Sequence, residues 1–161
     1  MERILDENDF IVSKTDKAGR ITYCNRIFMQ LAQYDEEELI GKPHSIIRHE
    51  KMPKAVFKLL WDRIEKKEEI FAFVINKSKS GDYYWVYANV TASLDEKGNI
   101  VGYYSVRRKP NRDAIPTIEA VYDEMLRIEK TKDMDGSIAY LTELLEEKGV
   151  SYDELIIGLQ G

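Results

Sequence analysis

Five short stretches of the chain are rich in β-branched and aromatic residues and are bounded by turn-forming residues, a pattern typical of β-strands. The first two stretches, Phe10–Thr15 and Arg20–Cys24, are joined by a short turn that contains Gly19 and predict a hairpin. The other three follow one another with similar turns and predict an antiparallel meander. They are Phe71–Lys77, Tyr83–Leu94 and Asn99–Arg108. Because every connection within each group is short, we expect antiparallel pairing.

Between the two groups of strands the apolar residues recur at helical spacing. A first helix is expected after Asn25, a good N-cap residue, and a second short helix over residues 35–40. Pro53 opens a third helix. One apolar stripe runs along this third helix and consists of Val56, Phe57, Leu60, Trp61 and Ile64.

Both faces of the meander carry apolar or aromatic side chains. With a period of two, Tyr83, Trp85 and Tyr87 share one face of their strand, opposite Tyr84 and Val86. One face should cover the core, and the other is too apolar to remain in water. We therefore expect a second layer of protein on the aromatic face.

Residues beyond 112 show helical periodicity, with expected breaks at Gly136 and Gly149. Net charge changes at the same point, from +2 for residues 1–111 to −7 for residues 112–161. The sequence thus predicts an α+β chain with one domain at residues 1–111 and a helical C-terminal extension at 112–161. The extension could cap the sheet, or it could serve docking or dimerisation.

Composition excludes several classes of protein. The net charge of −5 argues against general nucleic-acid binding, and no stretch approaches the ~20 apolar residues of a membrane helix. The N-terminus is too acidic for a signal peptide, and the single cysteine, Cys24, suits a reducing cytoplasm. Two histidines without further ligands at metal spacing make a zinc site unexpected, and no catalytic constellation is visible, so we do not expect an enzyme.

Residues 41–53 form the most unusual stretch of the chain. It holds both histidines, His44 and His49, together with Arg48 and two of the four prolines. The prolines prevent one regular helix, yet the apolar residues within the stretch require burial. We expect a structured loop with short helical turns that forms one wall of a ligand pocket. By contrast, the basic run Arg107–Lys109 at the end of a strand is expected to lie at a solvated rim.

Several of these motifs resemble a known family. Residues 16–25 (DKAGRITYCN) resemble the opening of PAS domains. Residues 39–49 (LIGKPHSIIRH) with Met52–Pro53, residues 76–86 (NKSKSGDYYWV) and residues 102–107 (GYYSVR) resemble the flavin-binding PAS domains of aerotaxis and energy-taxis receptors.

The resemblance implies a PAS fold: a five-stranded antiparallel sheet with short helices on one face, here followed by C-terminal helices. It also implies a buried FAD whose redox state reports respiratory electron flow. The positions that match the family's FAD-binding residues are Asn25, Arg48, His49, Phe57 and Asn76. Haem, or no cofactor at all, remains an alternative.

Two functions follow from the resemblance. The first is a cytoplasmic redox sensor that relays its state to a chemotaxis-type transducer or other signalling protein, as the detached PAS half of a bipartite energy-taxis system. The second is an interaction module that acts as a scaffold, with a second copy of the chain among its expected partners. Neither requires nucleic acid or direct insertion into a membrane.

Overall fold

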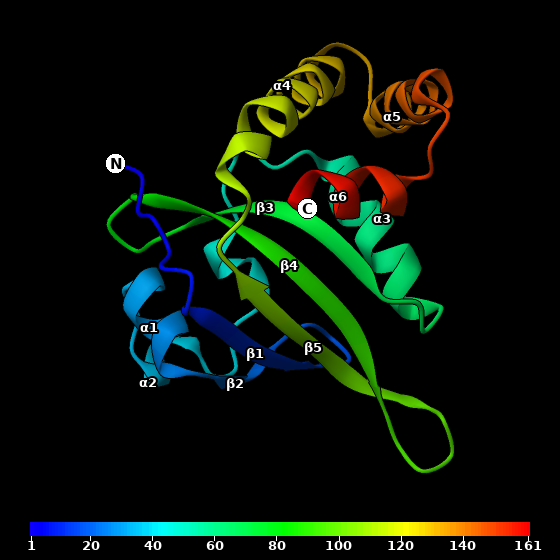
Figure 1. Cartoon of the computed structure of the whole chain (residues 1–161). Coiled ribbons are helices and arrows are strands. Elements are labelled where there is room, and N and C mark those ends of the chain that lie inside the picture. The colour runs from blue at the N-terminus through cyan, green and yellow to red at the C-terminus, as the bar shows by residue number, and fades with distance from the viewer.

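A five-stranded antiparallel sheet is the centre of the molecule (Figure 1). The computed structural model describes residues 1–161. The strands lie in the order β2-β1-β5-β4-β3, so the first hairpin pairs through β1 with the last strand of the meander. Their bounds are β1 Phe10–Asp16, β2 Ile21–Cys24, β3 Ile70–Lys77, β4 Tyr83–Leu94 and β5 Ile100–Arg108. The predicted antiparallel sheet is therefore confirmed.

Short helices cross one face of the sheet between β2 and β3. Asn25 caps α1 by accepting a hydrogen bond from the Phe28 N–H, and Asp35 caps α2 in the same way. The proline-containing stretch 41–53 holds one short 3₁₀ turn, η1, as its residues required. The bounds are α1 Arg26–Ala32, α2 Glu36–Leu39, η1 His44–Ile47 and α3 Lys54–Glu65.

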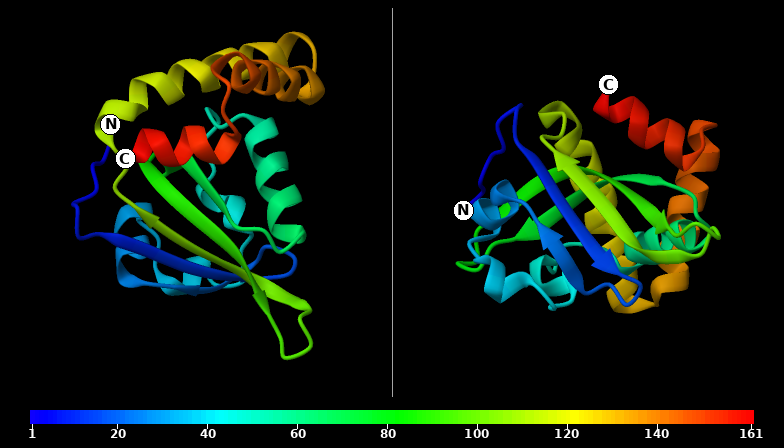
Figure 2. Two further views of the ribbon diagram at one scale, coloured as in Figure 1. Left: turned by 45° about the vertical axis from the view of Figure 1, so that its right-hand side comes forward. Right: turned by 90° about the horizontal axis from the view of Figure 1, so that it is seen from below.

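The C-terminal residues form helices that fold back onto the sheet. They are η2 Arg112–Ala114, α4 Ile115–Thr131, α5 Met134–Lys148 and α6 Tyr152–Gln160. Figure 2 shows α4, α5 and α6 grouped on the side of the sheet away from α1 and α2. The expected break at Gly136 was wrong, because Asp133 accepts a hydrogen bond from the Gly136 N–H and starts α5 at Met134.

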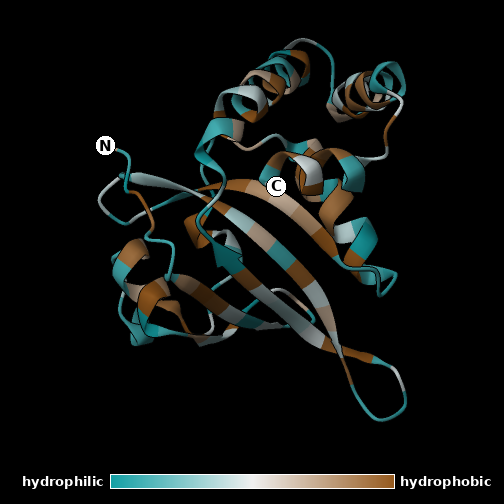
Figure 3. Cartoon of the chain, viewed as in Figure 1, coloured by the Kyte–Doolittle hydropathy of each residue, from teal (hydrophilic) through white to brown (hydrophobic).

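The side chains form two apolar clusters, and Figure 3 shows the underlying alternation as bands along the strands. The smaller cluster joins β1 and β2 to α1 and α2 and contains Ile11, Phe28 and Leu39. The larger cluster joins α3, β3 and β4 to the C-terminal helices. No helix of the chain combines the length and the apolar character that crossing a bilayer requires.

The second layer expected on the aromatic face is the C-terminal extension itself. Trp85 and Tyr87 are buried, and the ring of Tyr122 from α4 stacks on Trp85 with 6.1 Å between centroids. Two tyrosines also reach the edge strand β3: the Tyr122 hydroxyl donates to the Phe73 carbonyl (2.6 Å) and the Tyr152 hydroxyl to the Phe71 carbonyl (2.8 Å). The extension thus caps a sheet face and a sheet edge that would otherwise be free to pair with another chain.

Candidate functional site

A cavity of about 240 Å³ lies between the inner face of the sheet, α3 and the 41–53 stretch. Its walls are mainly apolar. They include Phe57, Leu60 and Trp61 from α3 and Val74, Ala88 and Val90 from β3 and β4. A mainly apolar cavity with a few polar groups is typical of a small-molecule site.

The α3 wall follows from the apolar stripe of that helix. Residues 57, 60, 61 and 64 recur at helical spacing and face the cavity together. Trp61 makes an edge-to-face contact with Tyr103 of β5, with 5.2 Å between ring centroids and planes at 88°. A Cβ at Gly19 would lie 3.5 Å from the Trp61 ring, and Gly19 has a φ of 84°, so glycine suits this turn for conformational reasons.

Arg48 and Phe57 stand together at the exposed side of the cavity. The Arg48 guanidinium carbon lies 3.9 Å above the centre of the Phe57 ring, a cation–π contact. The backbone of Arg48 pairs with that of Asn76, which ties the loop to the edge strand β3. Partial burial lowers the pKa of the Arg48 guanidinium from its ordinary value. The contact with Phe57 and the backbone pairing with Asn76 therefore fix Arg48 at the entrance of the cavity, and the N–H donors of its guanidinium remain available.

Asn76 presents a buried donor to the cavity. Its side chain is 4% exposed, and its Nδ2 has no hydrogen-bond partner in the chain. The facing residue on β4 is Tyr84, which does not line the cavity; burial raises the pKa of its hydroxyl to about 12, and the neighbouring Asn76 amide opposes this rise. Since buried polar groups are nearly always paired in folded proteins, the unpaired Asn76 donor in the cavity indicates a site for a ligand.

A second polar group lies on the β1–β5 side of the cavity. Arg107 is only 2% exposed, and its Nη2 donates to the Ser13 hydroxyl (2.7 Å), which lies 3.0 Å from His44 Nε2. The Arg107 guanidinium lies 4.7 Å from the centre of the Phe28 ring. Burial, followed by the charge of Arg107, lowers the pKa of His44 to about 3, so this imidazole is neutral.

Three of the five predicted site residues line the cavity, and two do not. Arg48, Phe57 and Asn76 are brought together around it. Asn25 instead caps α1 and joins β1 to β2, because its Oδ1 accepts from the Val12 N–H and its Nδ2 donates to the Phe10 carbonyl. His49 turns away: its Nδ1 accepts from the Lys51 N–H, and its ring packs edge-on against Tyr83.

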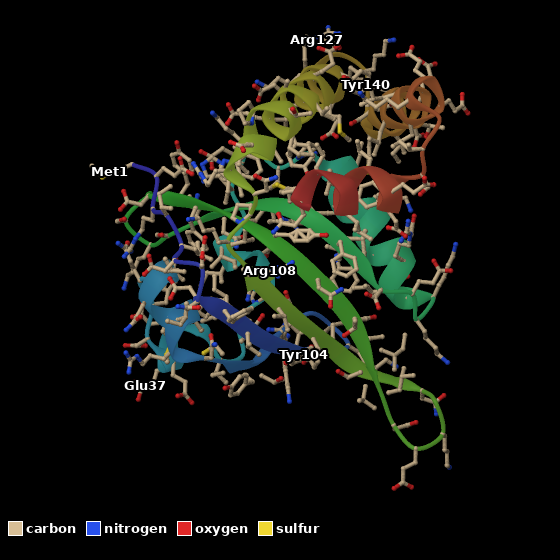
Figure 4. The ribbon with its side chains drawn as sticks, viewed as in Figure 1. Met1, Glu37, Tyr104, Arg108, Arg127 and Tyr140 are labelled. Atoms are coloured by element: carbon tan, nitrogen blue, oxygen red, sulfur yellow. The ribbon has the colours of Figure 1, made fainter.

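Sequence reasoning missed several lining residues. Trp61 was predicted only as part of an apolar stripe and Arg107 as solvated rim, and the rim prediction was wrong because Arg107 is buried. The alternation along β5 carried the missing signal. Residues 103, 105 and 107 share the inner face, whereas Tyr104 and Arg108 lie on the outer face (Figure 4).

The chemistry of the donors limits what the cavity can hold. No group of three His, Cys, Asp or Glu side chains is placed to bind a metal ion. His44 Nε2 faces the Ser13 hydroxyl and His49 Nδ1 faces a backbone N–H, so neither arrangement favours ligation of a haem iron. Cys24 is buried in the smaller cluster and does not line the cavity, so no thiol is positioned to react with a ligand there.

Comparison with protein families places the chain. The PAS fold family model matches residues 1–108, and the chain belongs to that family.

Two proteins of known name are similar to the chain in sequence. The aerotaxis receptor of Escherichia coli (strain K12) is 38% identical over 118 residues, which is 73% of this chain and 23% of the receptor. A nitrogen fixation regulatory protein of Klebsiella pneumoniae is 21% identical over 105 residues, 65% of this chain and 21% of that protein. The chain thus spans less than a quarter of the length of these relatives.

Solved structures agree on the fold. The light-state structure of the LOV domain of the blue-light photoreceptor Aureochrome1 gives a TM-score of 0.60 at 22% identity, covering 76% of this chain and 93% of that one. The LOV domain of a blue-light activated histidine kinase from Erythrobacter litoralis gives 0.57 at 18% identity, covering 62% and 94%.

Proposed function

We propose that this chain is a PAS sensory module that binds FAD in the cavity between the sheet and α3. In this proposal the redox state of the flavin is the signal, and a chemotaxis-type transducer or another signalling protein receives it. The proposed location is the cytoplasm. The observation that carries the proposal is a mainly apolar cavity whose lining includes buried unpaired donors of Asn76 and Arg107.

The donor set fits a flavin ring. An isoalloxazine has apolar faces and a polar edge, and the cavity offers Phe57 and Trp61 as walls with the amide of Asn76 as a partner for that edge. When bound, a flavin supplies the electron-transfer chemistry, while the protein supplies binding, orientation and electrostatics. The 38% identity to an aerotaxis receptor supports the same class of signal.

The residues of the proposed site have separate roles. Arg48, Phe57 and Asn76 contact the ligand, with Arg48 at the entrance, where its fork of donors suits a phosphate or a ring carbonyl. We assign Asn25 and His49 indirect roles, since Asn25 holds β1 and α1 in register and His49 holds the loop that carries Arg48. Substitutions at these two residues should therefore lower stability and flavin content together.

The proposed relay runs from α3 to the C-terminal helices. The Glu129 carboxylate of α4 accepts from the N–H groups of Lys54 and Ala55 at the start of α3 (2.8 and 3.2 Å). Near the other end of α3, Arg63 pairs with Asp153 of α6 at 3.0 Å. A ligand that shifts the α3 wall would therefore act on α4 and α6 directly, because both ends of α3 are attached to them.

Asn76→Ala tests the ligand assignment. It removes a buried donor that has no partner in the chain, so the free energy of unfolding of the ligand-free protein should stay equal or rise. Affinity for FAD should fall by about tenfold to hundredfold, the equivalent of roughly 1–3 kcal/mol for one buried hydrogen bond. Affinity is measured by flavin fluorescence titration and stability by urea unfolding.

Asn89→Ala is the matched control, because Asn89 lies on the same strand as Ala88 and Val90 but on the opposite face. Its affinity for FAD should equal that of the wild type. Unchanged affinity in a well-folded Asn76→Ala protein would reject the proposed site.

A further inference from the structure

Arg107 is a buried charge without a counter-charge. No carboxylate lies within salt-bridge distance of it, and its Nε and Nη1 are unpartnered; its single hydrogen bond goes to the neutral Ser13 hydroxyl. Burial lowers its pKa to about 10, which still leaves the guanidinium protonated at neutral pH. A buried charge normally has a partner, because desolvation without one costs several kcal/mol.

The groups that surround Arg107 do not supply negative charge. They are the Phe28 ring, the Ser13 hydroxyl, the neutral imidazole of His44 and the phenol of Tyr84, whose pKa is about 12. Arg107 lines the same cavity as Asn76, whose Nδ2 is also unpartnered. The cavity therefore offers unpaired donors and a positive charge, and no carboxylate side chain lines it.

We propose that Arg107 forms, with Asn76, a subsite for the ligand edge that becomes anionic on reduction, so that the cavity binds reduced flavin more tightly than oxidised flavin. This inference rests on the proposed function. Reduction of the bound flavin takes up two electrons and one proton and leaves one negative charge on the ring. In the assay dithionite supplies the electrons and water supplies the proton. The guanidinium then gains the counter-charge that the chain does not provide.

The first test compares Arg107→Met with Arg107→Lys in the full chain reconstituted with FAD. Methionine keeps an apolar stem and removes the charge, whereas lysine keeps the charge. We expect Arg107→Met to lower the preference for reduced over oxidised flavin at least tenfold, which lowers the two-electron midpoint potential by about 30 mV. Arg107→Lys, which keeps the charge, should have a midpoint potential close to that of the wild type. Equal midpoint potentials in the wild type and Arg107→Met would overturn the inference.

The second test needs no variant and therefore does not depend on the folding of one. The wild-type midpoint potential is measured against pH. Uptake of one proton with two electrons gives a slope of about 30 mV per pH unit, and uptake of two protons gives about 59 mV. We expect the shallow slope through neutral pH, and the steep slope there would overturn the inference.

The outcomes separate the two proposals. If the wild-type protein takes up no FAD, the proposed function fails, and this inference fails with it. If the wild type binds FAD but shows the steep slope, only the anion-binding role of Arg107 is lost. Removing a buried unpaired charge should not reduce stability, so Arg107→Met is expected to fold with the near-ultraviolet circular dichroism of the wild type.

Discussion

Removal of one hydroxyl group, in Tyr122→Phe, measures how firmly the C-terminal helices seal the edge of the sheet. Tyr122 is buried on α4, and its hydroxyl donates to the Phe73 carbonyl of the edge strand at 2.6 Å. Phenylalanine keeps the ring that stacks on Trp85. The substitution therefore removes the hydrogen bond with little change in packing.

The expected cost has two parts. A typical hydrogen bond contributes about 0.5–1.5 kcal/mol net, and a buried acceptor that loses its donor costs roughly 1–3 kcal/mol. Because the Phe73 carbonyl remains buried under α4, we expect the free energy of unfolding to fall by about 1–2 kcal/mol. For a chain of this size that corresponds to a decrease in Tm of roughly 2–8 °C.

Urea unfolding followed by circular dichroism measures the change, with an unchanged slope m as the sign that the same structure unfolds. Tyr140→Phe is the matched control. Tyr140 lies on α5 in the same extension (Figure 4), is only partly buried, and its hydroxyl makes no hydrogen bond within the chain. If Tyr122→Phe and the control both remained within about 0.3 kcal/mol of the wild type, the edge-sealing role would be refuted.

Two further predictions concern the same helices. Burial raises the pKa values of Tyr122 and Tyr152 in the folded state, so the unfolded state releases these protons first. The contribution of these two tyrosines to the free energy of unfolding should therefore be constant from pH 8 to about pH 10 and fall as pH rises further. Denaturant midpoints recorded from pH 8 to pH 11 check this, and a flat profile in the wild type, or the same fall in Tyr122→Phe with Tyr152→Phe, would contradict it. Glu129→Gln removes a negative charge from the start of α3 and should lower the free energy of unfolding by about 0.3–1 kcal/mol, less at high salt. Exposed Asp123→Asn on the same helix is its control, and equal stabilities of the two variants would argue against the attachment of α4 to α3.

Much of the fold was predictable because the local signals agree with one another. Turns with Gly and Asp separate the strands, and Asn25 and Asp35 cap the helices that follow them. The final position of the extension was left open, because a helix with an apolar stripe can pack on its own chain or on a partner with the same chemistry. The tyrosines that reach β3 resolve this, and their role depends on contacts more than 40 residues apart in sequence.

The candidate site was less predictable than the fold. Arg48, Phe57 and Asn76 were placed at the cavity by resemblance, and the same resemblance included Asn25 and His49, which lie outside it. Asn25 could have been excluded from the site on sequence alone, because its capping role before a helix already explains why an asparagine stands there. The burial of Arg107 was not predicted, because a run of basic residues at a strand end is usually solvated. Only its alternation with Arg108 shows which of the two side chains points inward.

The most direct test of the central claim is the flavin content of the wild-type protein. The purified chain is denatured, and the released cofactor is identified and quantified against protein concentration, both as isolated and after incubation with FAD. We predict FAD at close to one molecule per chain, with a structured visible spectrum that bleaches on reduction and returns in air. A colourless protein that neither releases a flavin nor takes one up would contradict the proposal that this cavity is a redox-sensing site.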